Sequence, residues 1–338
     1  MRSLLSVYSL FSRFVCRVKS RLFSARILKA KKAPLPVISV GNIALGGTEK
    51  TPLAMELLSY FLSRGFRPAL ITRGYRGTWE KSGGVLSDGQ TILGTWQEAG
   101  DEPAMIAEAV PRAGVFVGKD RLASCEKAKA LGFDIAVLDD GFQHIRLQRD
   151  LDIVLHDLRK PGALREGRSA FGRADILLLK DGGPETIQKK ILGSFPRLSV
   201  FNYSVAAKGF SRLGEKGIEP ATAWRGKKAL AFCGIARPKR FFSLLEGCGL
   251  LLTGRLTFPD HYAYPPRALE KIRRAVQESR PEALVTTEKD AVRLIGRREG
   301  LGPLPVAVLK IELALPEPVR ARLASFPTLA PGGRTSIQ

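Results

Sequence analysis

The sequence has 338 residues, of which 44% are hydrophobic and 25% are charged, so it is long for one domain and comfortable for two. Its four cysteines are scattered and form no Cys-x-x-Cys pair, which argues against a disulfide framework or a zinc site and fits a reducing cytoplasm. The formal net charge of +22 implies an anionic partner, which is nucleic acid, an acidic membrane surface or a phosphorylated substrate.

The first 32 residues carry nine Arg or Lys and no acidic residue. Their longest uncharged run, residues 3–12, is too short to span a bilayer. Apolar side chains recur every three or four residues and therefore share one helix face: Leu4, Tyr8, Phe11, Val15, Val18 and Leu22. We predict a basic amphipathic helix that lies on an anionic membrane surface. The alternative is a helix packed on the domain, with its cations solvated.

From residue 36 the chain alternates strand and helix patterns. The predicted strands of the first part are Val37–Val40, Pro68–Thr72, Gly114–Val117, Ile135–Leu138, Ile153–His156 and Ile176–Leu179, and its helices are Pro52–Arg64, Pro103–Val110 and Asp120–Leu131. The second part repeats the pattern with strands Leu230–Phe232, Leu250–Leu256, Ala283–Thr286 and Val306–Ile311 and helices Pro238–Glu246 and Pro266–Ser279. This alternation predicts an α/β fold whose mostly parallel, doubly wound sheet binds ligands at the carboxyl ends of its strands.

The strand pattern loses definition around Phe201–Lys208, which we interpret as a domain junction. We therefore predict a first domain over residues 33–203 and a smaller α/β domain over residues 204–326. The last residues, 327–338, are rich in Pro, Gly, Ser and Thr and are predicted to be a mobile tail.

A predicted strand, a glycine-containing loop and a Lys-Thr pair at the start of a helix suggest a phosphate-binding loop. The residues expected to surround the phosphates are Ala44, Leu45, Gly46, Gly47, Thr48, Glu49, Lys50 and Thr51. Lys50 would reach the outer phosphates, and the Thr51 hydroxyl would ligate Mg²⁺. Ala44 replaces the first glycine of the usual pattern, and Glu49 adds a Cβ and a carboxylate before Lys50. The alternative is an ordinary glycine-rich turn.

Two carboxylates, Asp139 and Asp140, follow a predicted buried strand, where an acidic group can hold Mg²⁺ beside nucleotide phosphates. An Asp after a strand is also common in turns and caps, but its pairing with the Lys-Thr loop upstream favours the metal site. Asp101 precedes a predicted helix and is either an N-cap or a general base that takes a proton from an attacking hydroxyl.

Several cationic loops follow the predicted strand ends, and together they could hold an anionic acceptor. Their candidate residues are Arg73, Tyr75, Arg121 and Arg173. Each alone is more typical of a solvated surface. The three histidines are too few and too dispersed to predict a metal cluster, and a solitary residue such as His261 is usually structural.

Taken together, these segments resemble the tetraacyldisaccharide 4'-kinase family of Gram-negative bacteria. The stretches that carry the resemblance are Ser39–Ile43 with Gly46–Pro52, Thr72–Tyr75, Gly100–Pro103, Val117–Arg121, Leu138–His144, Gly172–Asp175, Ala231–Ile235, Phe258–His261 and Val285–Asp290. They occur in family order. The Asp-Asp-Gly-Phe-Gln-His and Thr-Thr-Glu-Lys-Asp segments are far more specific than a phosphate loop.

The resemblance implies a P-loop NTPase-like fold and a peripheral enzyme on the cytoplasmic face of the bacterial inner membrane. Such an enzyme transfers the γ-phosphoryl of ATP to the 4'-hydroxyl of a tetraacyldisaccharide 1-phosphate and gives lipid IVA. Its partners would be this lipid and an anionic membrane surface, with no nucleic acid.

The resemblance also implies roles for the candidate residues. Lys50 and Thr51 would hold phosphates and Mg²⁺, and Asp139 and Asp140 would serve the metal. Asp101 would be the base, which His261 would orient or tune. Arg73, Tyr75, Arg121 and Arg173 would help to bind the acceptor head group.

Glu49 departs from the family, in which glycine is expected, so we expect a weakened or altered nucleotide site. Two alternatives remain open. One is a catalytically impaired lipid-binding homologue. The other is a nucleotide-switch ATPase that binds nucleic acid through the +22 charge.

Overall fold

The computed structural model describes residues 16, 18, 22–23, 27–44, 49–158, 164–215 and 217–326. Most of the predicted N-terminal helix, the predicted tail 327–338 and four residues of the predicted phosphate loop (Leu45, Gly46, Gly47 and Thr48) lie outside these residues. Within the described part, the chain divides into two compact units, one built from the chain up to Ser204 and again from Leu313, the other from Val205–Glu312.

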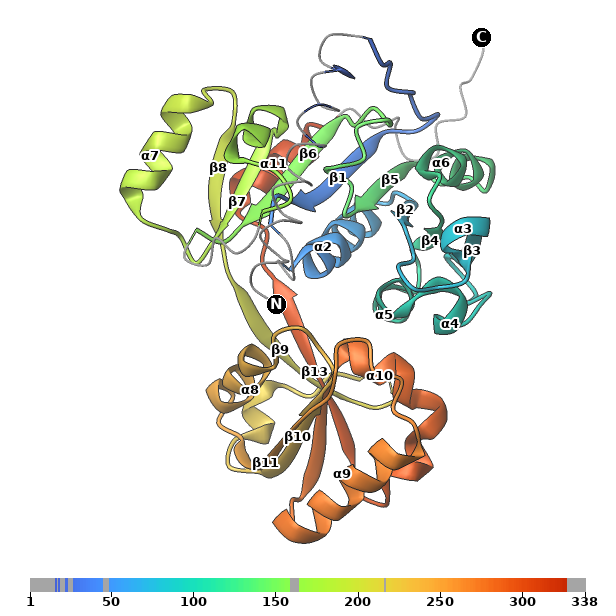
Figure 1. The fold of residues 1–338 in the computed structure, drawn as a ribbon, viewed down its shortest axis with the longest axis vertical. Coiled ribbons are helices and arrows are strands. Elements are labelled where there is room, and N and C mark those ends of the chain that lie inside the picture. The colour runs from blue at the N-terminus through green and yellow to red at the C-terminus, as the bar shows by residue number, and fades with distance from the viewer. Residues whose placement is uncertain are drawn as a thin grey trace. The chain divides into compact units, whose positions relative to one another are not determined.

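Unit 1 contains an 8-stranded sheet in the order β3-β4-β2-β5-β1-β6-β7-β8 (Figure 1). Its strands are β1 (Val37–Asn42), β2 (Pro68–Thr72), β3 (Gly84–Asp88), β4 (Gly114–Val117), β5 (Ile135–Asp139), β6 (Leu151–His156), β7 (Ile176–Lys180) and β8 (Ser199–Tyr203). Neighbouring strands are parallel, except that β3 pairs antiparallel with β4. The mostly parallel, doubly wound sheet that the sequence predicts is confirmed.

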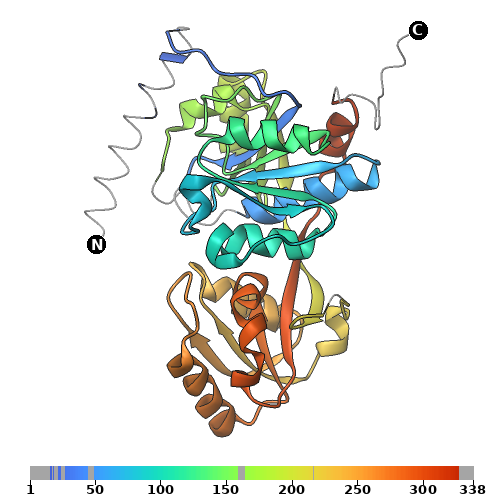
Figure 2. The ribbon, with the colours of Figure 1, turned by 90° about the vertical axis from the view of Figure 1, so that its right-hand side faces the viewer.

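Helices cover both faces of this sheet. They are α2 (Lys50–Ser63), α3 (Trp79–Ser82), α4 (Trp96–Ala99), α5 (Asp101–Ala109), α6 (Arg121–Ala130), α7 (Glu185–Ser194) and α11 (Glu317–Ala324). Cys125 and Ala128 of α6 share a core cluster with Val37, Ile71 and Phe116 of the strands. In Figure 2, the green α6 and the teal α5 lie on opposite faces of the sheet. The buried strands, bounded by helices, account for the uninterrupted apolar runs in the sequence.

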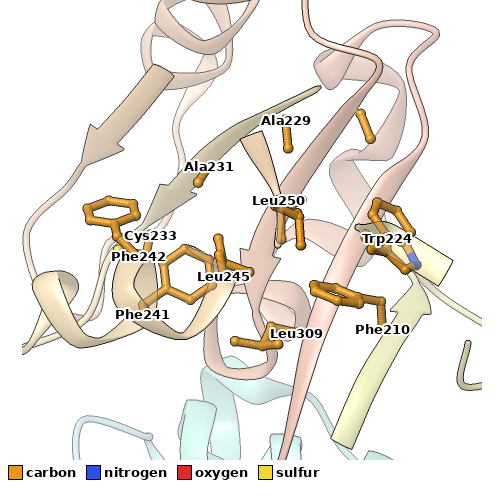
Figure 3. Close-up of a cluster of buried hydrophobic side chains, with 13 residues drawn as sticks. Phe210, Trp224, Ala229, Ala231, Cys233, Phe241, Phe242, Leu245, Leu250 and Leu309 are labelled. Atoms are coloured by element: carbon orange, nitrogen blue, oxygen red, sulfur yellow. The ribbon is translucent and has the colours of Figure 1, made fainter. Parts of the chain in front are cut away.

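Unit 2 contains a 5-stranded sheet in the order β11-β10-β12-β13-β9. Its strands are β9 (Val205–Arg212), β10 (Lys228–Cys233), β11 (Leu251–Thr257), β12 (Ala283–Thr287) and β13 (Val306–Leu313), and its helices are α8 (Pro238–Gly247), α9 (Pro266–Ser279) and α10 (Glu288–Leu294). One core cluster of this unit joins Phe241 and Leu245 of α8 to Leu309 of β13 and to the ring pair Phe210–Trp224, whose centroids are 4.8 Å apart (Figure 3). The smaller α/β unit therefore has a core of its own.

The region around Phe201–Lys208, where the sequence pattern loses definition, is regular in the structure. It forms the end of β8 and the start of β9, with only Ser204 between them. The sequence pattern is weak because β8 is an edge strand with mixed exposure, and because β9 carries small residues such as Ala206 and Ala207. Strand propensity reflects packing on a half-buried surface, which these residues supply poorly.

The C-terminal limit of the second unit differs from the predicted 204–326. The chain from Leu313 belongs to unit 1. The Arg320 guanidinium on α11 lies 2.7 Å from Glu56 Oε1 on α2, and the Tyr60 hydroxyl donates a hydrogen bond to the Arg320 carbonyl at 3.3 Å. Unit 2 is therefore inserted between two segments of unit 1.

Candidate active site

The candidate residues of unit 1 gather at the carboxyl ends of its parallel strands. The loop after β1 leads to Glu49 and Lys50, the loop after β2 contains Arg73 and Tyr75, and Arg121 follows β4 by way of a short loop. β5 ends in Asp139, and Asp140 follows it directly. Parallel strands end at the same edge of a sheet, so the fold brings these distant segments to one edge, where such sheets bind ligands.

The residue before α2 has an unusual backbone conformation. Glu49 occupies the left-handed region, with φ 55° and ψ 30°. A non-glycine residue there is strained by about 1–2 kcal/mol, because its Cβ approaches the following carbonyl. The family pattern places glycine at this position, so the conformation expected of that glycine is present although the residue is glutamate.

The Glu49 carboxylate is held between two donors. Lys180 Nζ donates to Oε1 at 3.1 Å, and the Tyr203 hydroxyl donates to Oε2 at 3.0 Å. The side chain of Glu49 is only 9% exposed. Glu49 therefore does not point to solvent.

Lys50 opens α2 and faces Asp140. Lys50 Nζ lies 3.5 Å from Asp140 Oδ1, while Arg165 Nη1 donates to Asp140 Oδ2 at 2.7 Å. Burial alone would raise the pKa of Asp140, but Lys50 and Arg165 outweigh it and hold this pKa below its usual value. Asp140 is therefore an ionised carboxylate between two cations.

Asp139 has the opposite electrostatic character. Its side chain is buried, and its Oδ1 atom has no hydrogen-bond partner among the described residues. Burial, followed by repulsion from Glu102, raises the pKa of Asp139 to about 7, although Lys50 and Arg121 oppose the shift. Two adjacent carboxylates thus differ in charge near neutral pH.

The carboxylate oxygens fit a magnesium ion better than a metal with an all-protein cage. The described part of the chain contains no group of three or more His, Cys, Asp or Glu side chains that could hold a metal. Mg²⁺ in nucleotide sites takes one or two carboxylates and completes its shell with phosphate oxygens and water. The buried, unpartnered Oδ1 of Asp139 is an oxygen that such an ion would satisfy.

Asp101 lies at the start of α5 and does not act as its N-cap. Gly100 occupies the N-cap position with φ 95°, and no described side chain caps this helix. A Cβ on Gly100 would lie 3.0 Å from the Tyr75 carbonyl oxygen, so the Asp101 loop packs closely on the loop after β2. The neighbouring Glu102 acts electrostatically on Asp139. The start of α5 thus faces the same edge as the paired carboxylates.

The four acceptor candidates lie in different environments. Arg73 is half exposed and pairs with Glu80 at 2.7 Å, and Tyr75 is 56% exposed. Arg121 is buried and donates to the Gly118 carbonyl, and burial lowers the pKa of Arg121 to about 10, with Asp139 the largest opposing influence.

Arg173 is held from two sides. Its Nη2 lies 2.9 Å from Glu166 Oε2, and its guanidinium lies 4.7 Å from the centre of the Phe142 ring. Gln143 also donates to Glu166, at 2.9 Å, so this arginine is linked to the Asp-Asp-Gly-Phe-Gln-His segment.

His261 belongs to unit 2, where it has a positive φ of 63°. Lys289 Nζ lies 3.3 Å from His261 Nε2 and 3.2 Å from Asp260 Oδ1. Asp260 Oδ2 lies 3.7 Å from the same ring nitrogen, so His261, Asp260 and Lys289 form one polar cluster. Lys289 comes from the Thr-Thr-Glu-Lys-Asp segment, so two of the family motifs meet within this unit.

The sequence reasoning overlooked three residues that contact or influence the candidates: Glu102, Lys180 and Tyr203. Glu102 was not predicted because the catalytic role in its motif was given to the neighbouring Asp101. Lys180 and Tyr203 are the last residues of β7 and β8. A residue at the carboxyl end of a parallel strand is a candidate for the site, and this position could have indicated both of them. Since β8 was not predicted, that signal could not be used.

Among the described residues, no helix is both long and apolar enough to cross a lipid bilayer.

The chain matches the family model described as tetraacyldisaccharide-1-P 4'-kinase over residues 1–327. A tetraacyldisaccharide 4'-kinase from Pelobacter propionicus is 37% identical over 96% of this chain and 93% of its own length, and one from Geobacter metallireducens is 36% identical over 95% and 97%. A crystal structure of LpxK from Aquifex aeolicus in complex with ATP superposes with a TM-score of 0.76 at 27% identity and covers 96% of this chain and 99% of that one. The chain therefore belongs to the tetraacyldisaccharide-1-P 4'-kinase family.

Proposed function

We propose that this protein is an ATP-dependent kinase that transfers the γ-phosphoryl group of ATP to the 4'-hydroxyl of a tetraacyldisaccharide 1-phosphate. The observation that carries the proposal is the contact of Lys50 with Asp140, next to the buried Asp139, at the ligand-binding edge of the sheet in a chain of this family. Among the contacts of the described residues, none favours an impaired lipid-binding protein or a nucleic-acid-binding switch.

For the nucleotide, we assign the phosphates to the segment from Ala44 to Thr51. Lys50 would neutralise the outer phosphates, and the backbone N–H groups at the start of α2 would point toward them. Thr51 and the Asp139–Asp140 pair would hold Mg²⁺, which supplies positive charge beside the transferring phosphoryl group.

For the transfer step, we assign Asp101 as the general base. The oxygen of the 4'-hydroxyl attacks the γ-phosphorus, a new P–O bond forms, and the bond to the β-phosphate oxygen breaks so that ADP leaves. The hydroxyl proton passes to the Asp101 carboxylate. Asp101 is 6% exposed, so little water surrounds this group. His261 remains a predicted catalytic residue of unit 2.

For the acceptor, the exposed side chains of Arg73 and Tyr75 are suited to contact the phosphorylated disaccharide directly. Arg121 and Arg173 are engaged within the protein, so we assign them a supporting role, in which they supply positive charge to the edge of the sheet without leaving their partners.

We also propose that the protein acts as a peripheral enzyme at an anionic membrane surface, on the cytoplasmic face of the inner membrane. The support is the acid-free, nine-cation segment over residues 1–32 with its apolar stripe. Removal of residues 1–32 should abolish sedimentation with phosphatidylglycerol vesicles at 0.1 M salt. Equal sedimentation of both chains would contradict this assignment.

The kinase itself is tested by transfer of labelled γ-phosphate to a tetraacyldisaccharide 1-phosphate in detergent. We expect transfer by the full chain and a loss of about 10²–10⁴-fold for Asp101→Asn, the range for removal of a general base. Glu108→Gln, an exposed change on the same helix, is the control and should retain full activity. Absence of transfer by the unaltered chain would refute the proposed function.

A further inference from the structure

The carboxyl edge of the unit 1 sheet, where the nucleotide phosphates are assigned, contains a carboxylate that the proposed chemistry does not use. Glu49 directly precedes Lys50, at the point where the chain enters α2. An ionised carboxylate beside a polyphosphate repels it, and repulsion is strong where solvent is largely excluded. The side chain of Glu49 is 9% exposed, so solvent screens it poorly. A Glu49 carboxylate that is not neutralised would therefore weaken ATP binding.

The structure provides a partner for each oxygen of this carboxylate. Lys180 Nζ lies 3.1 Å from Oε1, and the Tyr203 hydroxyl lies 3.0 Å from Oε2. The Lys180 side chain is 12% exposed, and Tyr203 is 4% exposed. We call these three residues the Glu49 clasp. The Glu49 carboxylate is thus bound by the Lys180 ammonium group and by the neutral Tyr203 hydroxyl, and all three groups are largely shielded from solvent.

Both donors of the clasp are fixed by the sheet. Lys180 ends β7 and Tyr203 ends β8, and the two residues are partners in the parallel register of these strands. The N–H group of Asp181 donates to the Tyr203 carbonyl at 2.8 Å, which ties the two strand ends together. The clasp is therefore anchored on regular structure, and it determines where the Glu49 carboxylate lies.

We propose that Lys180 and Tyr203 are positioning residues of the nucleotide site. They neutralise the Glu49 carboxylate, hold it on the side of β7 and β8, and so keep the left-handed turn before Lys50 compatible with a bound polyphosphate. The proposal rests on the proposed use of ATP. In this proposal, the positive charge of Lys180 neutralises Glu49 and does not bind the phosphates.

The test is a double-mutant cycle on the full chain, with Lys180→Met, Glu49→Gly and the two combined. The affinity for the Mg²⁺ complex of a non-hydrolysable ATP analogue is measured by titration calorimetry without lipid. Lys180→Met alone should weaken binding about 10-fold, within the range of coupling between contacting residues. In the Glu49→Gly background, the same change should alter affinity by less than about 2-fold, because no carboxylate remains to be neutralised.

Two further variants sharpen the cycle. Lys180→Arg keeps the positive charge and should retain most of the affinity, and Tyr203→Phe should weaken binding less than Lys180→Met because it removes only a neutral donor. Lys189→Met, which removes a lysine that is 74% exposed on α7, is the matched control and should leave affinity unchanged. If Lys180→Met does not fold, as judged by thermal unfolding, Lys180→Arg and Tyr203→Phe in both backgrounds complete the cycle.

An equal loss of affinity for Lys180→Met in both backgrounds would mean that Lys180 binds phosphate directly, and would overturn the proposal. So would unchanged affinity in the Glu49-containing chain. The proposed function is tested by a different measurement. If the affinities follow the expected cycle but the chain transfers no phosphate to lipid, the role of the clasp stands and the kinase assignment is wrong. If the chain transfers phosphate to lipid but the cycle shows no coupling between Lys180 and Glu49, the kinase assignment stands and the role of the clasp is wrong.

Discussion

Lys50 Nζ lies 3.5 Å from Asp140 Oδ1, and this pair joins the start of α2 to the end of β5 across two neighbouring parallel strands. Arg165 approaches the second oxygen of the same carboxylate at 2.7 Å. Lys50 thus has a fixed anionic neighbour at the edge where the nucleotide phosphates are assigned. Its ammonium group is placed before any nucleotide arrives, which limits the ordering that binding requires.

Lys50→Met should lower kcat/KM for ATP by about 10²–10³-fold, the loss typical of removing one preorganised electrostatic group. Folding should persist, because Arg165 still pairs with Asp140. Steady-state transfer assays and thermal unfolding check the two statements. A decrease in kcat/KM of less than about 3-fold would show that Lys50 does not stabilise the transition state and has mainly a structural role.

The buried Asp139 should make the metal-free protein sensitive to pH. Burial raises its folded-state pKa from 3.8 to about 7, so the folded chain binds this proton more tightly than the unfolded chain. The stability from this group is complete below about pH 4 and is lost as pH rises through about 7. At pH 8, Asp139→Asn should therefore be more stable to thermal unfolding than the unaltered chain, with a free energy of unfolding that is higher by on the order of 4 kcal/mol.

The pH dependence and Mg²⁺ provide the control for this prediction. The advantage of Asp139→Asn should shrink steadily as pH falls from 7 to 4 and should narrow at pH 8 when Mg²⁺ is added, because the ion favours the ionised side chain. Glu126→Gln, an exposed change on α6, should show neither trend. A difference that does not vary between pH 4 and pH 8 would contradict the assignment.

Arg121 should act as a buried counter-charge. Its pKa, lowered by burial to about 10, leaves it protonated at neutral pH, and Asp139 and Asp140 are the carboxylates that oppose this shift. Arg121→Met should destabilise the protein by about 3 kcal/mol, since it leaves buried negative charge uncompensated. The effect should be smaller at pH 5, where Asp139 binds a proton. Urea unfolding of this variant and of the exposed control Arg322→Met measures the difference.

Unit 2 depends on Asp290, which is fully buried. Its carboxylate accepts hydrogen bonds from the Gly234 N–H at 3.1 Å, the Tyr264 hydroxyl at 2.9 Å and the Thr287 hydroxyl at 2.6 Å, and Arg293 lies 3.1 Å away. Asp290→Ala should destabilise the protein by about 3–5 kcal/mol, because a buried arginine loses its partner.

Tyr264→Phe provides the graded comparison in this network. It removes one hydroxyl donor and retains the ring, so it should destabilise by only about 1 kcal/mol. Chemical unfolding followed by the far-ultraviolet signal compares the two variants. Similar destabilisation by both would mean that the Tyr264 hydroxyl bond, and not the pairing of Asp290 with Arg293, accounts for most of the loss.

The buried parallel strands were the most predictable part of the fold. β2 and β4 begin and end where the sequence places them, because uninterrupted apolar runs fill strands that are covered on both faces. α9 was equally clear, with a proline in its first turn and a strong apolar stripe. The antiparallel edge strand β3 was missed, since it is only partly buried and its pattern is short.

The candidate site was predictable as a set of residues but not as a set of charges. Position at strand ends identified Lys50, Asp139 and Asp140, and the structure brings them together. That Asp139 titrates near pH 7 while Asp140 stays ionised depends on which cations face each carboxylate. The clasp partner of Glu49, Lys180, is far away in sequence and reaches it only through the strand order β1-β6-β7. The catalytic roles of Asp101 and His261 stay predictions.

The inserted position of unit 2 affects the order in which unit 1 can be completed during synthesis. Glu56 on α2 leaves the ribosome early, but its partner Arg320 on α11 follows only after the whole of Val205–Glu312 has been translated. At bacterial elongation speeds this delay is roughly 5–20 s. During that time the nascent first unit lacks its last helix, so the surface of α2 that α11 later covers is open to chaperones and proteases.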